Sequence, residues 1–272
     1  MSLKIGTVSK LTGFSASGIR YYEERGIVTP SHGRDGTYRS FDLPDVSRLL
    51  ECRNYRECGC DTEEIAGLVS DGTRDDVMAA LESCEARARE EVERAQRLEA
   101  FLAHRTAVMR EIVGGNLAPR VARSPATYWA PLWMPGSCDG VEPRIPTGEE
   151  GFPIPYADSS LLLDEECFDA ASSLVGVSVG YAVARAYVTA APRADDVVFL
   201  PAARCVRAPL RVGDDFSPCA EDVAAVRAFL RAERLAVAGR AFTHRVCTVY
   251  GERGLRFDEM WVPVRPTAAD AC

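Results

Sequence analysis

Three neighbouring side chains suited to binding a nucleic-acid backbone, Arg20, Tyr21 and Tyr22, lie close to the N-terminus. An arginine can pair with a phosphate or with guanine, and a tyrosine hydroxyl can hydrogen-bond a phosphate oxygen. Residues 1–56 carry nine basic and six acidic side chains, whereas the formal net charge of the whole chain is −8. Because phosphates respond to the local field, this uneven distribution is compatible with nucleic-acid binding.

The elements that would position these side chains are predicted from glycines and helix caps. Residues 5–12 place apolar side chains on one helical face, and Gly13 ends that helix. Ser15 is a good N-cap for a second helix, SASGIRYYEERG, which Gly26 stops. Two short helices joined by a glycine-containing turn predict a helix-turn-helix.

A hairpin and further helices are predicted next. Asp35-Gly36 is a strong turn signal between two short extended pieces. The hairpin would present Arg34, Tyr38 and Arg39. A third helix is expected after Asp42, a plausible cap, and a fourth begins near Asp61.

Residues 74–113 contain neither glycine nor proline, and Gly114 ends the pattern. Their apolar seam has alternating spacings of four and three, as in coiled coils: Val77, Leu81, Cys84, Ala88, Ala95, Leu98, Leu102, Met109 and Ile112. The helix would be roughly 60 Å long, too long to bury its stripe within a small domain. The pattern therefore favours dimerisation through this helix; the alternative is packing against its own chain.

The order of these motifs resembles the MerR family of transcription regulators. The matching segments are IRYYEERGIVTP, GTYRSFDLPDVSRL and RECGCDTEEI, and the resemblance covers residues 3–70 closely. It implies a homodimer that bends and undertwists promoter DNA for RNA polymerase. It also implies DNA contacts from Ser15, Ser17, Arg20, Tyr21 and Tyr22 in the recognition helix, from Arg34, Tyr38 and Arg39 in the wing, and from Arg56. One of the two tyrosines, Tyr21 or Tyr22, is expected to be half-buried, and either could instead be a core aromatic.

The remaining residues, 118–272, hold 14 of the 16 prolines and predict a mixed α+β domain. Strands are expected at 121–134, 175–189, 196–212, 242–250 and 257–264, and an amphipathic helix at 219–235. The strand–helix–strand–strand end is similar to the GyrI-like effector domain. That resemblance rests mainly on residues 196–266 and implies an antiparallel sheet with a small-molecule pocket. Residues 135–172 show no clean amphipathic helix to match the second half.

All three tryptophans and most aromatic residues lie in this section. Small-molecule pockets are mostly apolar and aromatic with a few placed polar groups, so this content is consistent with such a pocket. The predicted effector-binding residues are Tyr128, Trp133, Tyr156, Tyr181, Tyr187, Phe242, His244, Glu259 and Trp261. Aromatic faces with a buried carboxylate suit a lipophilic cation. However, relatives that bind cationic drugs carry a further glutamate on the preceding strand, where this chain has Thr243 and His244. We therefore expect a lipophilic organic effector, cationic or not. Residues 139–169, which hold nine acids and one arginine, are either a cation-attracting lid or a solvated loop.

Ten cysteines are spread from Cys52 to Cys272 without any C-x-x-C pair. Cys58-Gly-Cys60 is too tight for the usual zinc spacing, so we expect neither a metal site nor a cofactor. A metal- or thiol-responsive regulator using Cys58, Cys60 or Cys84 stays an alternative. A second is hydrolysis of the ligand by Glu259 and His244, although no nucleophile elbow or His-Glu-x-x-His motif supports an enzyme. A third is an architectural DNA binder without a ligand.

The sequence thus predicts an α+β protein in three parts. They are a winged helix-turn-helix domain over residues 1–73, an antiparallel coiled-coil dimerisation helix over 74–115, and a GyrI-like effector-binding domain over 118–272. The expected partners are promoter DNA, RNA polymerase, a second copy of the chain and a small organic effector. No hydrophobic signal segment and no apolar run of about 18 residues is present, so we expect a cytoplasmic protein without a membrane partner.

Overall fold

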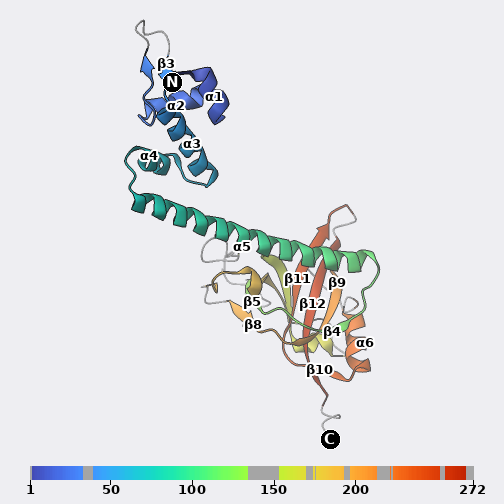
Figure 1. Cartoon of the computed structure of the whole chain (residues 1–272). Helices are drawn as coiled ribbons and strands as arrows, with labels where there is room; N and C mark the ends of the chain where they lie inside the picture. The colour runs from blue at the N-terminus through green and yellow to red at the C-terminus, as the bar shows by residue number, and fades with distance from the viewer. Residues whose placement is uncertain are drawn as a thin grey trace. The chain divides into compact units, whose positions relative to one another are not determined.

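A computed structural model of the chain describes residues 2–32, 39–133, 153–169, 174, 176–192, 197–212, 221, 223–251 and 255–267. The chain divides into two compact units, Met1–Ala95 and Gln96–Cys272, and the boundary falls inside the longest helix (Figure 1). Among the described residues, no helix is both long enough and apolar enough to cross a membrane.

The first unit is built from short helices on a small sheet. Its helices are α1 (Ile5–Thr12), α2 (Ala16–Glu24), α3 (Leu43–Glu57) and α4 (Thr62–Ser70). Strands β1 (Leu3–Lys4), β2 (Ser31–His32) and β3 (Arg39–Phe41) pair antiparallel in the order β1-β3-β2. The predicted helix-turn-helix is confirmed in α1 and α2.

The turn between α1 and α2 follows from its residues. Gly13 has a φ of 75°, a left-handed conformation that a side chain would strain, and the Ser15 hydroxyl accepts a hydrogen bond from the Gly18 amide. Arg53 of α3 donates to the Thr12 carbonyl at 2.9 Å and fixes the end of α1. The turn geometry therefore determines the direction of α2 relative to α1.

Helix α5 (Arg74–Val113) continues through both units, and its apolar side chains differ in whether they are covered by the chain itself. Cys84 is buried in the core of the first unit, while Phe101 and Val108 are buried in the second. Leu98 and Leu102 keep 36% and 51% of their surface exposed. Part of the helix thus packs against its own chain, and another stripe of it stays uncovered in the single chain.

The second unit contains one antiparallel sheet. Its strands are β4 (Arg120–Arg123), β5 (Thr127–Trp133), β6 (Asp158–Leu163), β7 (Val177–Ala184), β8 (Val198–Leu200), β9 (Arg204–Val212), β10 (Leu235–Val237), β11 (Ala241–Val249) and β12 (Leu255–Pro266). The described residues give the order β4-β9-β12-β11-β6-β7-β5-β8, with β10 paired to β12. Two short 3₁₀ helices, η1 (Glu165–Phe168) and η2 (Arg185–Tyr187), complete it together with α6 (Ala224–Ala232). The predicted α+β class with an antiparallel sheet is confirmed.

Strand β12 divides the core of this unit because its side chains alternate between two faces. Met260, Val262 and Val264 join a cluster that includes residues of α6. Glu259 and Trp261 point to the other face, where a cavity is lined by side chains of α5. The sheet therefore separates an apolar core from a candidate site.

Strand β6 was not predicted, and the reason is chemical. It lies inside the acid-rich segment 139–169, yet all six of its residues are buried. Asp158, Ser159 and Ser160 resemble loop residues in sequence, but the strand pairs on both sides, with β11 and β7. A solvated loop or lid over the whole segment is therefore wrong for residues 158–163, while residues 139–152 lie outside the described part.

A buried polar network joins β6, β11 and β12. Arg256 donates to the Asp258 carboxylate at 2.5 and 2.6 Å and to the Ser159 carbonyl at 2.9 Å. The Thr243 hydroxyl donates to Asp258 at 2.7 Å and accepts from the Leu161 amide. Both charges are buried, so each depends on the other for compensation.

We predict that Arg256→Met destabilises the second unit by about 3–5 kcal/mol, because it leaves the buried Asp258 carboxylate uncompensated. Urea unfolding followed by tryptophan fluorescence measures this, since all three tryptophans lie in residues 118–272. The control is Arg265→Met at the exposed end of the same strand, which should change little. Equal midpoints for the two variants would contradict the role given to the network.

Candidate functional sites

A basic groove of about 500 Å³ lies on the first unit, lined by the start of α1, α2 and β3. Its described lining includes four basic side chains and no acidic one: Lys4, Lys10, Arg20 and Arg39. Arg39 also donates to Glu23 at 2.8 Å, which holds the side chain at the end of β3. The arrangement suits an anion with several oxygens, such as a nucleic-acid backbone.

Arg20 and Arg39 were predicted from the sequence as DNA-contact residues, whereas Lys4 and Lys10 were not. The signal for the lysines was weak because they lie outside the recognition helix and the wing. They reach the groove only because β1 pairs with β3 and α1 follows β1 directly.

Other predicted DNA-contact residues have varied positions. The Ser15 hydroxyl caps α2 by accepting from the Gly18 amide, and it lies 2.9 Å from the hydroxyl of Ser17, which is exposed. Tyr21 is half-buried, with the Arg25 guanidinium 3.5 Å from its ring centroid. Arg56 is exposed on α3. Arg34 and Tyr38 lie outside the described residues.

Tyr22 departs from its predicted role at the DNA surface. It is 1% exposed and packs in the core of the first unit, with Phe14 and Tyr21 against its ring. Its position on α2 faces the helix bundle, so burial of the large ring outweighs exposure of its hydroxyl. The prediction for Tyr22 is therefore corrected: it is a core residue.

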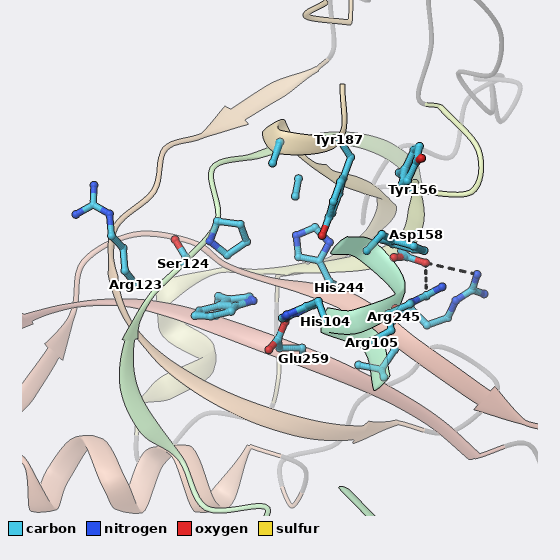
Figure 2. A pocket seen from close by; sticks show the side chains of 16 residues that line it. His104, Arg105, Arg123, Ser124, Tyr156, Asp158, Tyr187, His244, Arg245 and Glu259 are labelled. Atoms are coloured by element: carbon cyan, nitrogen blue, oxygen red, sulfur yellow. Dashed lines mark hydrogen bonds and ion pairs between the residues drawn. The ribbon is translucent and has the colours of Figure 1, made fainter. Parts of the chain in front are cut away.

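The second unit contains a cavity of about 380 Å³ between α5 and the sheet. Five of the predicted effector residues line it: Tyr156, Tyr187, His244, Glu259 and Trp261. Figure 2 shows Tyr187, His244, His104 and Glu259 grouped in its middle, Asp158 with Arg105 and Arg245 on one side, and Arg123 on the opposite side.

The other predicted effector residues lie elsewhere. Tyr128 stacks near Phe199 with ring centroids 5.0 Å apart, Tyr181 packs in the cluster around Phe101, and Phe242 is buried in a separate core. The Trp133 side chain lies outside the described part, although its backbone belongs to β5. Tyr128, Tyr181 and Phe242 are corrected from pocket to packing residues, because their rings pack among neighbouring side chains of the sheet.

Sequence reasoning missed the contribution of α5. Phe101, His104 and Arg105 line the cavity, together with Asp158 of β6 and Arg245 of β11. Arg105 occupies a position between Leu102 and Met109 where the seam spacing calls for an apolar residue, and this charge was the available signal. It lies where the helix packs against the sheet of the second unit.

Glu259 is 2% exposed and accepts from Arg207 on one oxygen and from His104 at 2.8 Å on the other. Burial alone would raise the pKa of Glu259, but the hydrogen bonds and charges of His104 and Arg207 hold it below its usual value. The hydrogen bond that His104 makes to the Glu259 carboxylate raises the pKa of His104. Arg207 also donates to Glu111 of α5 at 2.6 Å. Arg120 adds a second pairing that, with Arg207, lowers the pKa of Glu111 to about 2.

Burial is also the main cause of the pKa shifts of Asp158 and His244, which line the same cavity. Loss of hydration raises the pKa of Asp158 to about 7, although Arg105 pairs with it at 2.6 Å and Arg245 lies 3.9 Å away. Burial lowers the pKa of His244 to about 4, and its Nε2 lies 3.0 Å from the Thr127 hydroxyl. His244 is therefore a neutral imidazole near pH 7.

Comparison with known proteins bears on the first unit. Residues 3–71 match the model of the MerR HTH family regulatory proteins. Residues 3–71 form a MerR-type helix-turn-helix domain. The transcriptional regulator TnrA of Bacillus subtilis is 48% identical over 63 residues, which are 23% of this chain and 56% of TnrA. The regulator CueR of Escherichia coli is 35% identical over 68 residues, 25% of this chain and 50% of CueR. The chain thus spans about half the length of these curated relatives.

One solved structure covers most of the chain. A cryo-EM structure of the EcmrR–DNA complex in EcmrR-RPo aligns over 97% of this chain and 100% of that chain, with 13% identity and a TM-score of 0.37. A crystal structure of the EcmrR C-terminal domain aligns over 56% of this chain and 99% of that one, with 11% identity and a TM-score of 0.38. At these values the likeness carries no functional argument.

Within the MerR-type domain and the start of α5, two thiols meet. Cys60 Sγ lies 3.3 Å from Cys84 Sγ, and Arg87 donates to Cys84 at 3.2 Å. Burial raises the pKa of Cys60 to about 11, so it is a thiol rather than a reactive thiolate at neutral pH. Among the described residues, no group of three or more histidine, cysteine, aspartate or glutamate side chains could hold a metal ion. The pair has the chemistry of a packing contact.

We predict that His104→Gln destabilises the second unit more at low pH than at high pH. The folded-state pKa of His104 lies above its unfolded value, so the pairing with Glu259 contributes fully below about pH 6.5. It is lost as the pH rises through the raised folded value. Urea unfolding by tryptophan fluorescence between pH 6 and pH 9 measures the difference from wild type.

The matched control is His32→Gln, which removes an imidazole from the other unit. A difference for His104→Gln that does not shrink with rising pH would mean that the histidine contributes by packing alone.

Proposed function

We propose that the chain is a homodimeric DNA-binding transcription regulator whose second unit senses a small organic molecule. The observation that carries the proposal is the MerR-type domain over residues 3–71. The curated relatives that it matches are named transcriptional regulators. Promoter DNA and RNA polymerase are the partners that follow from this reading.

The basic groove supports DNA binding. Arg20 projects from the exposed side of α2, and Lys4, Lys10 and Arg39 surround the same groove. Each phosphate that such cations neutralise releases counterions, so the affinity should fall steeply with salt. We assign Arg20 to α2-mediated contact in the major groove and the lysines to the flanking backbone.

The uncovered stripe of α5 supports a homodimer. Leu81, Leu98 and Leu102 lie on this helix at coiled-coil spacing and are exposed in the single chain. A second α5 packed antiparallel would remove their apolar surface from water. The other face of the helix is already used by the second unit.

The cavity in the second unit supports effector binding. Its volume and its aromatic lining fit a small organic molecule, and the charged side chains in the same lining could orient it. Because Phe101, His104 and Arg105 of α5 line it, an effector would contact the proposed dimer helix directly. We propose that this GyrI-like unit responds to its ligand by shifting α5, which changes how the dimer bends and undertwists promoter DNA.

The rival functions have less support from the same residues. Glu259 is held by Arg207 and His104, and His244 is neutral and bonded to Thr127, so neither is placed as a free acid or base for hydrolysis. A thiol-responsive regulator would use Cys58, Cys60 or Cys84, and burial raises the pKa of Cys60 to about 11, which disfavours its thiolate. The size of the cavity argues against an architectural binder without a ligand.

We predict that Arg20→Ala weakens DNA binding by on the order of tenfold to a hundredfold, as expected for one lost charge-assisted contact to a base or phosphate. The probe is a duplex selected by the full-length protein from a random-sequence pool, and fluorescence anisotropy measures the affinity. Arg89→Ala, on the exposed surface of α5, is the matched control. Unchanged affinity for Arg20→Ala would remove this residue from the interface.

We predict that the double variant Leu98→Glu, Leu102→Glu is a folded monomer, whereas the wild type is a dimer. The substitutions place charges in the stripe that a second helix would cover, while exposed positions leave the fold of the single chain intact. Multi-angle light scattering measures the mass, and Leu117→Glu, an exposed leucine beyond the helix, is the control. A wild type that is monomeric, or a variant that stays dimeric, contradicts the assigned interface.

A further inference from the structure

The cavity of the second unit has an aromatic wall formed by three separate segments of the chain, which contribute Phe101, Tyr156 and Tyr187. Phe101 of α5 meets Tyr156 and Tyr187 edge-on, with ring centroids 5.3 and 5.4 Å apart. Tyr156 and Tyr187 stack on each other at 5.3 Å with an interplanar angle of 15°. Such rings line the cavity with aromatic edges and faces, so an aromatic ligand suits it by its chemistry.

Both carboxylates that line the cavity are already paired within the protein. Glu259 accepts from Arg207 and His104, and Asp158 accepts from Arg105 at 2.6 Å. A cationic ligand would have to displace a buried partner from one of them, which would leave a protein charge unpaired in an apolar site. The pocket therefore lacks a carboxylate that is available to a cation.

Cations outnumber carboxylates in the lining. Arg105, Arg123, Arg245 and His104 face the cavity alongside only two acids. The balance shifts further because burial raises the pKa of Asp158 to about 7, so this acid is partly neutral near physiological pH. In a site of low dielectric, such an excess attracts an anion and repels a cation.

Arg245 is the residue best placed to bind the anion. Its guanidinium lies 3.9 Å from Asp158, too far for a hydrogen bond, and its side chain is about one-third exposed (35%). In contrast, Arg105 is engaged by Asp158, by the Arg245 carbonyl and by the face of Phe101. Figure 2 shows Arg245 and Asp158 at the side of the cavity where Tyr156 lies.

We propose that this cavity binds a planar aromatic molecule with an anionic group, such as an aromatic carboxylate, which stacks on the Phe101–Tyr156–Tyr187 wall and pairs with Arg245. This inference rests on the proposed function, in which the cavity is the effector site. It replaces the cationic option that the sequence analysis left open. The ligand's negative charge offsets the excess of cations in the lining, and no internal hydrogen bond has to break, because Arg245 lies 3.9 Å from Asp158.

The experiment compares three ligands of one shape with different charge: 2-naphthoate, 2-naphthamide and 2-naphthyltrimethylammonium. Isothermal titration calorimetry on the full-length protein at neutral pH measures each affinity. We expect the order carboxylate, amide, ammonium, from tightest to weakest. Arg245→Met should weaken binding of the carboxylate by on the order of tenfold and leave the amide nearly unchanged, because only the anion uses the charge-assisted bond.

Arg211→Met, an exposed arginine of β9 away from the cavity, is the matched control and should change none of the affinities. Tightest binding of the ammonium compound would overturn the anion inference while leaving an organic effector site in place. Binding of none of the three by a folded protein would overturn both the inference and the effector part of the proposed function. An equal loss for carboxylate and amide in Arg245→Met would overturn the pairing assigned to Arg245.

Discussion

The second unit depends on how the buried carboxylate of Glu259 is compensated. Taking a carboxylate out of water is unfavourable by several kcal/mol unless charged partners replace the lost hydration. Arg207 of β9 and His104 of α5 supply those partners, and Arg207 also pairs with Glu111, about two turns further along α5. The same ions therefore hold the helix on the sheet. The cavity lies beside these ion pairs, between the helix and the sheet.

The first unit could be predicted closely because its signals are local. Gly13 and Ser15 determine the turn between α1 and α2 through backbone conformation and a single capping bond. Asp42 accepts from the Asp45 amide while Asp45 accepts from the Asp42 amide, a capping box that begins α3 where a cap was expected. Tyr22 was less predictable than these. In sequence Tyr22 follows the exposed Arg20 and the half-buried Tyr21. Which face of α2 is covered depends on how α1 and α3 pack against it, and the local sequence does not give that packing.

The second unit was harder to predict because its determinants are not local. Strand β6 is polar in sequence, and its serines and aspartate become acceptable in the interior only when Thr243, Arg256 and neighbouring backbone groups meet them. Glu259 could be selected as a candidate ligand-facing acid from the resemblance of the last strand to effector domains. Its partners could not, because His104 and Arg207 lie 155 and 52 residues away. Without those partners, an acid among aromatics indicates a cation site; with them, the same acid is neutralised and the cavity has the opposite preference.

One helix serves both proposed functions, and this limits how an effector can act. Helix α5 carries Cys84 in the core of the first unit and Phe101, His104 and Arg105 along the cavity of the second. A ligand changes the DNA-binding equilibrium only by the difference between its affinities for two conformations. Contacts with the sheet alone would be equal in both and would shift nothing. Contacts with α5 can differ between the two conformations if the helix shifts relative to the sheet. The cavity is therefore located where binding energy can be converted into movement of the helix.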